Sequence, residues 1–365
     1  MAFCPEDILS CYSASYAEAR RTFLRAAEAQ DAAVTSHLNP CGQGVSGEDL
    51  CMDIATVGSA DADSALIVSS ATHGIEGYAG SALQTGLLRD DIAKSLPDNS
   101  ACHLVHAVNP FGFSHCRRVN EDNVDVNRNF VGFSHPLADS DDFLRFCAFA
   151  ARERKEGRAA DDTEVTARYL AAEGEQRYQR ALTLGQYSNP TAIHFGGREP
   201  TWSNRIWRGF LDHALPGRAL TIHMDIHTGL GRFGQETLIY TRDPGARGYE
   251  LACQCYGGDE LLIPGGALTP DVSGPIPSSF ARFEDDTVVI GVAPEFGTVP
   301  LNQMLTTLVE ENTLWHSECR GESERKASVE RMMHCFCPDD AGWRIGVWRR
   351  FRRRIDQTIK LLNNL

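Results

Sequence analysis

Four short apolar segments, each followed at once by a polar or charged residue, most constrain the fold of this chain. They cover residues 64–72, 102–108, 219–226 and 287–294, and we predict a buried strand in each. The segments between them place apolar residues at helical spacing, so strands and helices alternate along the sequence. This alternation is typical of an α/β protein with a mixed, largely parallel twisted sheet flanked by helices.

Shorter patterns predict the remaining elements. We expect helices over residues 6–33, 77–94, 141–185, 301–318 and 340–363, and short strands over 236–241 and 259–263. Segment 264–279 is rich in Gly and Pro and is predicted to be a loop long enough to act as a lid. No internal repeat or low-complexity linker divides the sequence, so we interpret residues 1–365 as a single domain.

Charge and hydropathy exclude several classes of partner. The chain has 35 Lys and Arg against 49 Asp and Glu, a net charge of -14, whereas nucleic-acid binders normally have a basic excess. No segment approaches the roughly 18 consecutive apolar residues of a membrane span. The N-terminal residues lack the basic-then-apolar pattern of a signal peptide, so we expect a cytoplasmic protein. The oligomeric state stays open, with a homo-oligomer as one alternative.

The 12 cysteines are scattered along the sequence. None forms a C-x-x-C pair, and the C-x-C pairs Cys253/Cys255 and Cys335/Cys337 lack the second half of a structural zinc site. We therefore interpret the cysteines as free, reduced thiols.

Three chemically reactive side chains, His73, His227 and Glu295, each follow one of the predicted strands. Ligands bind at the carboxyl ends of strands in parallel sheets, so these side chains are expected to meet. A catalytic zinc takes three protein ligands and leaves one position for water. Glu76, three residues after His73, can share an ion with it, and His227 is the natural third ligand. Asp225 lies on the same strand face as His227 and is expected to orient a ligand from behind.

Further motifs accompany this group in a fixed order. In sequence order they are His73-Gly-Ile-Glu76, Asn109-Pro-Phe-Gly112, Arg118-Val-Asn120, Val124-Asp-Val-Asn-Arg-Asn-Phe130, Asp225-Ile-His227 and Glu295-Phe-Gly-Thr298. With these motifs the chain resembles the zinc carboxypeptidase superfamily over about residues 64–300. The H-T-G-L-G and E-F-G-T versions are most similar to a poorly characterised bacterial branch of that superfamily. The resemblance implies a carboxypeptidase-like fold and one zinc ion per chain, held by His73, Glu76 and His227.

The same resemblance implies roles for four further residues. Glu295 matches the general base, which takes a proton from the attacking water. Arg118 matches the residue that stabilises the oxyanion. Asn127 and Arg128 match the pair that binds the free carboxylate of the substrate, for which the planar guanidinium group is suited. The implied activity is hydrolysis of an amide bond adjacent to a free carboxylate.

Structural interpretations of these residues stay open at this point. Glu295 could be an acid placed before helix 301–318, where it would favour the helix dipole. Arg117 competes for the oxyanion role, and the two adjacent arginines could also form a solvated surface pair. Arg128 could form a salt bridge with Asp125. We interpret His223 as a core residue or as a residue that supports a ligand.

The sequence departs from the family at the loop before the catalytic Glu. Characterised carboxypeptidases carry a mobile Tyr there, whereas residues 268–281 contain none. The substrate is therefore expected to be a small peptide or an N-acyl amino acid, and the alternatives are a carboxypeptidase and a deacylase or amidase. A non-catalytic binding protein of the same fold is a third alternative. Within the lid, Asp271 and Ser273 are the polar candidates for substrate selection.

A basic amphipathic segment ends the sequence. Residues 340–363 combine several arginines with Trp343, Trp348 and Phe351. Such a helix could bind an anionic surface or nucleic acid. We favour the interpretation that its aromatic face packs on the domain, or forms an oligomer contact, with the arginines turned outward.

Overall fold

A computed structural model describes residues 3–59, 61–265, 272–317 and 321–364. In this part of the chain, nine strands form one sheet in the order β1-β2-β4-β3-β5-β9-β7-β8, and β6 pairs with β9. The strands are β1 (Ala33–Gln43), β2 (Asp49–Gly58), β3 (Ser64–Ser69), β4 (Ser100–His106), β5 (Leu220–Asp225), β6 (His227–Gly229), β7 (Glu236–Tyr240), β8 (Leu261–Leu262) and β9 (Val288–Gly297).

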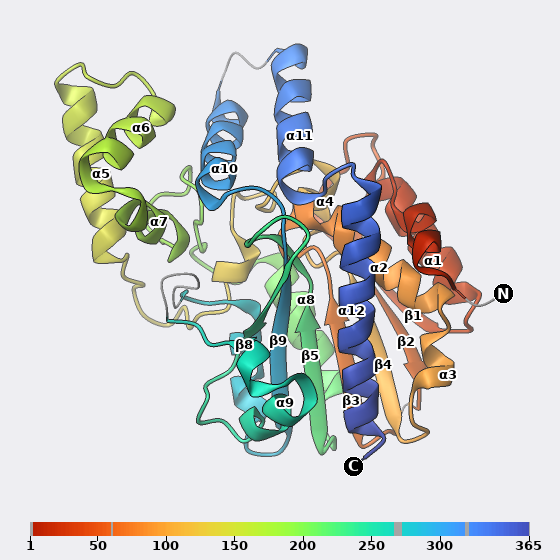
Figure 1. Ribbon diagram of the computed structural model, residues 1–365. Coiled ribbons are helices and arrows are strands. Elements are labelled where there is room, and N and C mark those ends of the chain that lie inside the picture. The colour runs from red at the N-terminus through yellow and green to blue at the C-terminus, as the bar shows by residue number, and fades with distance from the viewer. Residues whose placement is uncertain (1–2, 60, 266–271, 318–320, 365) are drawn as a thin grey trace.

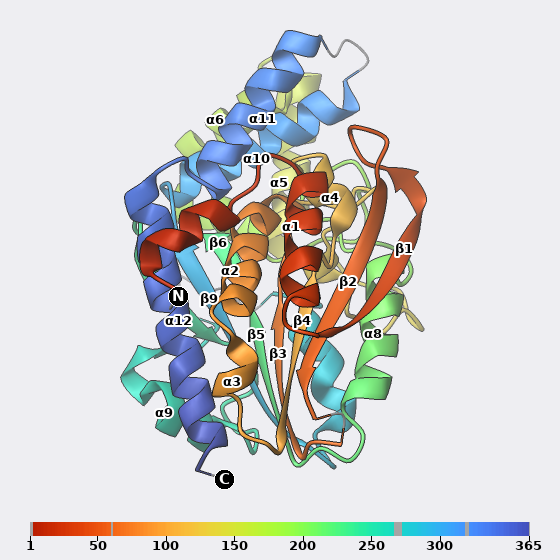
Figure 2. The same cartoon turned by 90° about the vertical axis from the view of Figure 1, so that its right-hand side faces the viewer.

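Helices surround the sheet (Figures 1 and 2). The α-helices are α1 (Tyr16–Glu28), α2 (Gly77–Arg89), α3 (Ile92–Ser95), α4 (Pro110–Ser114), α5 (Asp141–Lys155), α6 (Asp162–Glu173), α7 (Glu175–Thr183), α8 (Trp202–Ala214), α9 (Tyr249–Tyr256), α10 (Leu301–His316), α11 (Glu322–Phe336) and α12 (Ala341–Leu362). The 3-10 helices are η1 (Pro5–Cys11), η2 (Gly74–Glu76), η3 (Val126–Arg128), η4 (Gly258–Glu260) and η5 (Ile276–Phe283).

Both faces of the sheet are buried under helices. Helices α1, α2 and α12 cover one face and α8 covers the other (Figure 2). Alternate residues of β3 divide accordingly, because Leu66 and Val68 belong to the core on the first face and Ile67 to the core on the second. The central strands β4, β3, β5 and β9 are parallel. Strand β2 is antiparallel to β1 and β4, and β7 is antiparallel to β9 but parallel to β8. The predicted mixed, largely parallel α/β class is therefore confirmed.

The N-terminal region differs from the prediction of one helix over residues 6–33. The chain forms η1 and then α1, because Ser15 adopts an extended backbone and its side chain accepts a hydrogen bond from the Glu18 backbone N–H. The hairpin of β1 and β2 was not predicted at all. Strand β1 is an exposed edge strand that contains Pro40 and Gly42, so it lacks the alternating apolar pattern of a half-buried strand.

Strand β9 is longer than predicted, which changes the place of Glu295. The prediction that this residue lies just past the strand end was wrong, since β9 continues to Gly297. Strand β6 pairs with this extension in parallel, with His227 opposite Glu295 and Gly229 opposite Gly297. Strand β7 pairs with it from the other side. Pairing on both sides stabilises an extended backbone beyond the end of the apolar run.

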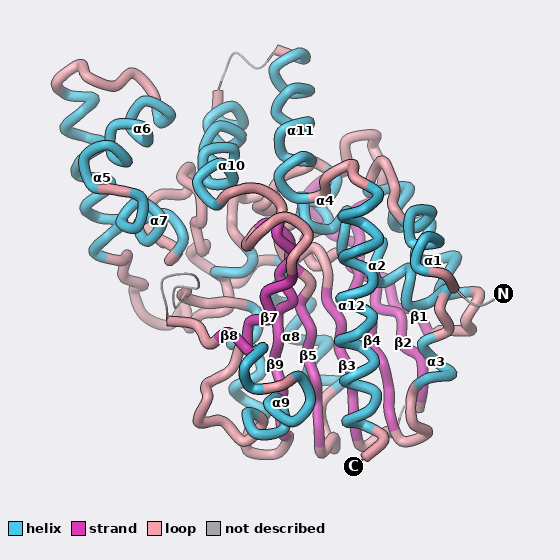
Figure 3. The backbone as a smooth tube through the Cα atoms, viewed as in Figure 1, coloured by secondary structure: helices cyan, strands magenta, loops and turns pink. Residues whose placement is uncertain are grey.

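The helices outside the sheet layer follow the prediction more closely. Helices α5, α6 and α7 occupy the predicted segment 141–185 and project to one side of the sheet (Figure 3). Helix α10 begins at the predicted residue, and α11 after it was not predicted. The described cysteines are free. Among the residues the structure describes, no helix has the length and apolar character needed to cross a membrane.

Helix α12 packs on the domain through its aromatic face. Trp343, Trp348 and Phe351 are buried, as the favoured interpretation expected. Most of the arginines pair with acids of the chain itself, as in Arg349–Glu6 and Arg352–Asp90. Arg354 departs from the expected outward orientation, because it is 3% exposed and forms an ion pair with Glu236. The basic character of the helix is therefore matched within the fold.

Candidate active site

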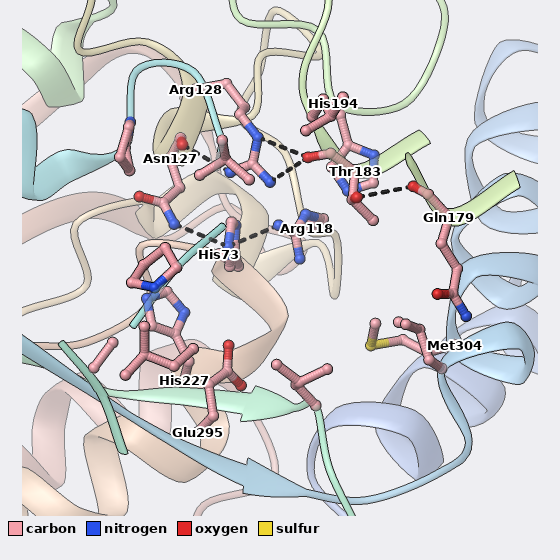
Figure 4. A pocket seen from close by; sticks show the side chains of 18 of the residues that line it. His73, Arg118, Asn127, Arg128, Gln179, Thr183, His194, His227, Glu295 and Met304 are labelled. Carbon is pink, nitrogen blue, oxygen red and sulfur yellow. Dashed lines mark hydrogen bonds between the residues drawn. The ribbon is translucent and has the colours of Figure 1, made fainter. Parts of the chain in front are cut away.

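A cavity of about 650 Å³ opens at the carboxyl ends of the parallel strands. His73, Glu76, His227 and Glu295 line its floor, and Figure 4 shows His227 and Glu295 on one side of it. Helices α7 and α10 and the described parts of segment 264–279 form the walls. The strand ends therefore bring together the residues that the sequence predicted to meet.

A close contact between two loops positions His73 and Glu76. His73 precedes η2, and Glu76 ends it at the start of α2. Gly74 lies directly against the turn at Gly112, since a Cβ atom on Gly74 would be 2.1 Å from the Gly112 carbonyl carbon. The H-G-I-E motif thus packs against the backbone of the N-P-F-G motif, which explains the Gly at position 74. Gly112 is required for a different contact, because a Cβ atom there would be 2.6 Å from Asn109 Nδ2 and from the Val119 carbonyl oxygen.

The three proposed metal ligands converge in a buried group. Ligand atoms of His73, Glu76 and His227 all lie within 4.8 Å of one another. On His73, Nε2 lies 2.8 Å from Arg118 Nη2 and Nδ1 lies 3.4 Å from Asp125 Oδ1. On His227, Nδ1 faces Glu76 at 2.9 Å and Nε2 faces Asp225 at 2.7 Å. A carboxylate behind each imidazole is the support that metal-ligating histidines usually have, so these residues fit a divalent metal ion.

Charges around His227 favour a cation at this position. Burial alone would lower the pKa of His227, but the carboxylates of Asp225 and Glu76 raise it well above its usual value. Asp225 is itself fixed, because its Oδ1 accepts hydrogen bonds from Ser69 Oγ at 2.6 Å and Thr72 Oγ1 at 2.8 Å. A metal ion at the ligand group would supply the positive charge that a proton otherwise supplies.

Arg118 lies beside the ligand group and is held there at both ends. Its backbone carbonyl accepts hydrogen bonds from Gly74 N at 3.1 Å and Asn109 Nδ2 at 3.2 Å. Its guanidinium donates to Asp125 Oδ2 at 3.0 Å and to His73 Nε2 at 2.8 Å. Although burial alone would raise the pKa of Asp125, Arg118 holds it well below its usual range. The guanidinium group is therefore a fixed positive charge on the cavity wall.

Arg117 is excluded from the same role by its position. Its guanidinium is 1% exposed and donates to Glu311 Oε1 at 2.7 Å, and it stacks over the ring of Trp315 at 4.0 Å. It does not line the cavity. The two adjacent arginines are thus not a solvated surface pair, and Arg117 ties the loop that carries Arg118 to helix α10.

Glu295 projects into the cavity from β9, and the charges of His227 and Glu76 act on its carboxyl group in opposite directions. Its Oε2 is buried and has no hydrogen-bond partner among the described residues. Burial raises its pKa to about 7, with the charge of Glu76 adding to the rise and His227 and Arg118 opposing it. A carboxyl group with this pKa exchanges a proton readily near neutral pH.

Asn127 and Arg128 belong to η3, which Asp125 caps by accepting a hydrogen bond from the Asn127 backbone N–H at 3.0 Å. The Arg128 side chain is buried and lines the cavity. It donates from Nε and Nη2 to the Thr183 carbonyl at 3.2 and 2.8 Å. Within the described part of the chain it has no carboxylate within ion-pair distance, so the predicted alternative of a salt bridge with Asp125 does not occur. Asn127 Oδ1 accepts from the Ile276 backbone N–H at 2.8 Å.

Sequence motifs missed several residues of the cavity wall. Gln176, Gln179 and Arg180 reach it from α7, a segment to which the sequence assigned no role. His194 reaches it from an irregular loop that carries no recognisable motif. No tyrosine is among the described residues that line the cavity, which agrees with the absence of Tyr from segment 268–281.

Two other sequence predictions concern the lid and the core. Asp271 lies outside the described residues. Ser273 Oγ accepts a hydrogen bond from Tyr187 Oη at 3.2 Å and is not among the residues lining the cavity. His223 is a core residue, fully buried against Trp207 and Phe280, with Nε2 2.9 Å from the Ser69 hydroxyl.

The fold and this site first define a class: an α/β protein with a buried His-Glu-His group at the carboxyl ends of its central strands. Residues 12–350 match the family described as "Protein of unknown function (DUF2817)", and the chain belongs to that family. A comparison with curated proteins gives no match.

Solved structures similar to the chain include hydrolases of the class that the motifs resemble. Carboxypeptidase A from Helicoverpa armigera is 14% identical with a TM-score of 0.48, covering 93% of this chain and 73% of its own. The metallo-carboxypeptidase from Burkholderia cenocepacia is 15% identical with a TM-score of 0.40, covering 87% and 67%. The succinylglutamate desuccinylase from Chromobacterium violaceum is 15% identical with a TM-score of 0.37, covering 87% and 74%. At these identities, the activity has to be argued from the residues of the chain itself.

Proposed function

We propose that the chain is a zinc-dependent hydrolase that cleaves an amide bond next to a free carboxylate. One observation carries this proposal: His73, Glu76 and His227 offer ligand atoms within 4.8 Å of one another in the cavity that holds Glu295. Two imidazoles and one carboxylate are a donor set of catalytic zinc sites. A bound zinc ion would polarise the scissile carbonyl group and lower the pKa of water.

The residues around the ligand group supply the proton transfer and the charge stabilisation. Glu295 is proposed to take a proton from the attacking water and to pass it to the leaving nitrogen, for which a pKa of about 7 is suited. No tyrosine competes for this role among the described lining residues. Arg118 is proposed to donate hydrogen bonds to the carbonyl oxygen as negative charge develops there.

Recognition of the free carboxylate is assigned to Arg128, with Asn127 beside it. A buried guanidinium group whose hydrogen bonds go to carbonyl oxygens keeps its full charge for an anion. A carboxylate at this position would lie across the cavity from Glu295, with the scissile bond between them. The partners are therefore proposed to be small peptides or N-acyl amino acids.

A deacylase or amidase acting on small N-acyl amino acids is the second candidate. Two observations favour it over a carboxypeptidase acting on peptides. Helix α7 contributes the polar side chains of Gln176, Gln179 and Arg180 to the cavity wall, and these suit the polar groups of a small acyl amino acid. The tyrosine of characterised carboxypeptidases has no counterpart among the described lining residues.

Hydrolysis of two substrate series tests the proposal. Zinc-loaded wild type and Glu295→Gln would be assayed with N-acetyl amino acids and with peptides of increasing length. We expect metal-dependent hydrolysis in the wild type and its loss in the variant. Preference for the N-acetyl amino acids would identify a deacylase, and preference for peptides a carboxypeptidase. No hydrolysis of either series would favour the non-catalytic binding protein.

The cytoplasmic location, the absence of nucleic-acid and membrane partners and the single-domain organisation stay predictions from the sequence. A homo-oligomer stays an alternative, although the proposed site is built from residues of a single chain. These properties do not enter the proposed reaction.

A further inference from the structure

His194 is a polar residue of the cavity that the proposed reaction does not use. Its side chain is 2% exposed and lines the cavity. Its Nδ1 is buried and has no hydrogen-bond partner among the described residues. Buried polar atoms without a partner are rare in folded proteins, and this one belongs to a ring that lines the cavity.

The backbone at His194 is strained and firmly held. Its φ of 55° lies in the left-handed region, which glycine adopts at lower cost than any other residue. The His194 carbonyl accepts a hydrogen bond from Gln186 N at 3.1 Å, and the next carbonyl, of Phe195, accepts one from Asp125 N at 2.7 Å. The backbone conformation therefore does not explain why a histidine, rather than a glycine, occupies this position.

Burial and two neighbouring guanidinium groups favour the neutral form of this imidazole. Burial, followed by the charge of Arg118, lowers the pKa of His194 well below its usual value, and Arg128 acts in the same direction. Figure 4 shows His194 next to Thr183, whose carbonyl accepts from Arg128. The ring is therefore neutral, with one nitrogen that donates and one that accepts.

We propose that His194 is a substrate-binding residue whose imidazole ring donates a hydrogen bond to the free carboxylate bound by Arg128. This inference rests on the proposed function and deepens it. Arg128 supplies charge, while a neutral donor supplies direction, and two cationic neighbours favour an anionic oxygen as its acceptor. The site would then select substrates with a free carboxylate over their uncharged amides.

The test uses the full chain with Glu295→Gln, so that bound molecules are not hydrolysed. N-acetylglycine and its uncharged amide, N-acetylglycinamide, are titrated into protein labelled with ¹⁵N-histidine. The His194 signals are identified by their absence in His194→Gln. We expect N-acetylglycine to shift the His194 ring signals and N-acetylglycinamide to leave them in place.

Two substitutions separate the side chain from its backbone. His194→Gly suits the positive φ and removes the donor, while His194→Asn tolerates this φ and keeps a shorter donor. We expect His194→Gly to raise the dissociation constant of N-acetylglycine about tenfold, with no effect on N-acetylglycinamide, since a hydrogen bond to a charged group contributes this much. The dissociation constant of N-acetylglycine for His194→Asn should lie between those for the protein with His194 and for His194→Gly.

Three outcomes would overturn the inference. They are unmoved His194 signals in the presence of N-acetylglycine, an unchanged dissociation constant in His194→Gly, and an equal loss of binding for the acid and the amide. The last outcome, together with a lower melting temperature, would mark a structural role. The proposed function fails separately, when zinc-loaded wild type hydrolyses no substrate although the carboxylate still shifts the His194 signals.

Discussion

His227 and Glu295 are opposite each other on two neighbouring parallel strands, β6 and β9. One is a proposed metal ligand and the other is the proposed general base. The pairing fixes their separation through backbone hydrogen bonds rather than through flexible side chains, so a base is held beside the ligand group without a mobile loop.

Substitution of Glu295 by Gln keeps the shape of the side chain and removes its ability to accept a proton. We expect kcat to fall by about 10² to 10⁴, the usual contribution of a general base. The zinc content should stay at the level of the wild type, because Glu295 is outside the ligand group. Steady-state kinetics and metal analysis on the same preparation check both statements, and a variant with wild-type kcat would remove Glu295 from the mechanism.

Asp225 supports His227 from behind, so Asp225→Asn should weaken metal binding. We expect the affinity for zinc to fall about 10- to 100-fold, as for other residues that orient a metal ligand. Competition with a chelator measures this affinity. Asp53→Asn is the matched control, because Asp53 is equally buried but pairs with Arg20 on another part of the sheet. Equal losses in the two variants would contradict a specific role for Asp225.

The buried ion pair of Arg117 and Glu311 ties the loop of Arg118 to α10. Glu311→Gln leaves the Arg117 charge buried without its carboxylate, and we expect the free energy of unfolding to fall by about 3 kcal/mol. Glu173→Gln breaks the exposed pair with Arg177 and should cost less than about 0.5 kcal/mol. Urea denaturation compares the two variants, and similar values would show that the buried pair does not hold the loop.

His106 links stability to pH. It is fully buried, stacks on Phe23, and burial lowers its pKa to about 4. Above its unfolded pKa of about 6.5 the ring is neutral in both states, and as the pH falls toward 4 only the unfolded chain takes up the proton. The histidine should therefore cost about 1.4 kcal/mol of stability per pH unit in this window, and nothing further below it.

A comparison of wild type with His106→Gln isolates this effect from the many carboxylates that also titrate. The difference in the free energy of unfolding should change between pH 6.5 and 4 and be constant outside that window. A difference that is independent of pH would place the folded pKa of His106 near its ordinary value.

Much of the sheet and of the metal group follows from local sequence. The strands that precede His73 and His227, β3 and β5, are buried on both faces, so their apolar runs were sufficient to locate them. The ligands then stood out because they follow those runs directly. The end of β9 was not predictable in this way, since pairing with β6 and β7, and not hydrophobicity, extends it past Glu295.

Other parts of the site depend on contacts between distant segments. His194 carries no motif, and only the fold of its loop against Asp125 brings it to the cavity. The sequence of α7 predicts a helix, but no motif in it indicates that Gln179 lines the cavity. Strand β1 is an exposed edge strand without an apolar pattern, so its pairing with β2 could not be predicted from the sequence.

The metal content of the purified protein tests the central claim most directly. Wild type, His227→Ala and the control His135→Ala, an exposed histidine, would be analysed side by side after zinc is supplied and excess removed. We predict about one zinc ion per chain in the wild type and in the control, and its loss in His227→Ala. No zinc in the wild type, or equal zinc in all three proteins, would contradict a metal centre at His73, Glu76 and His227.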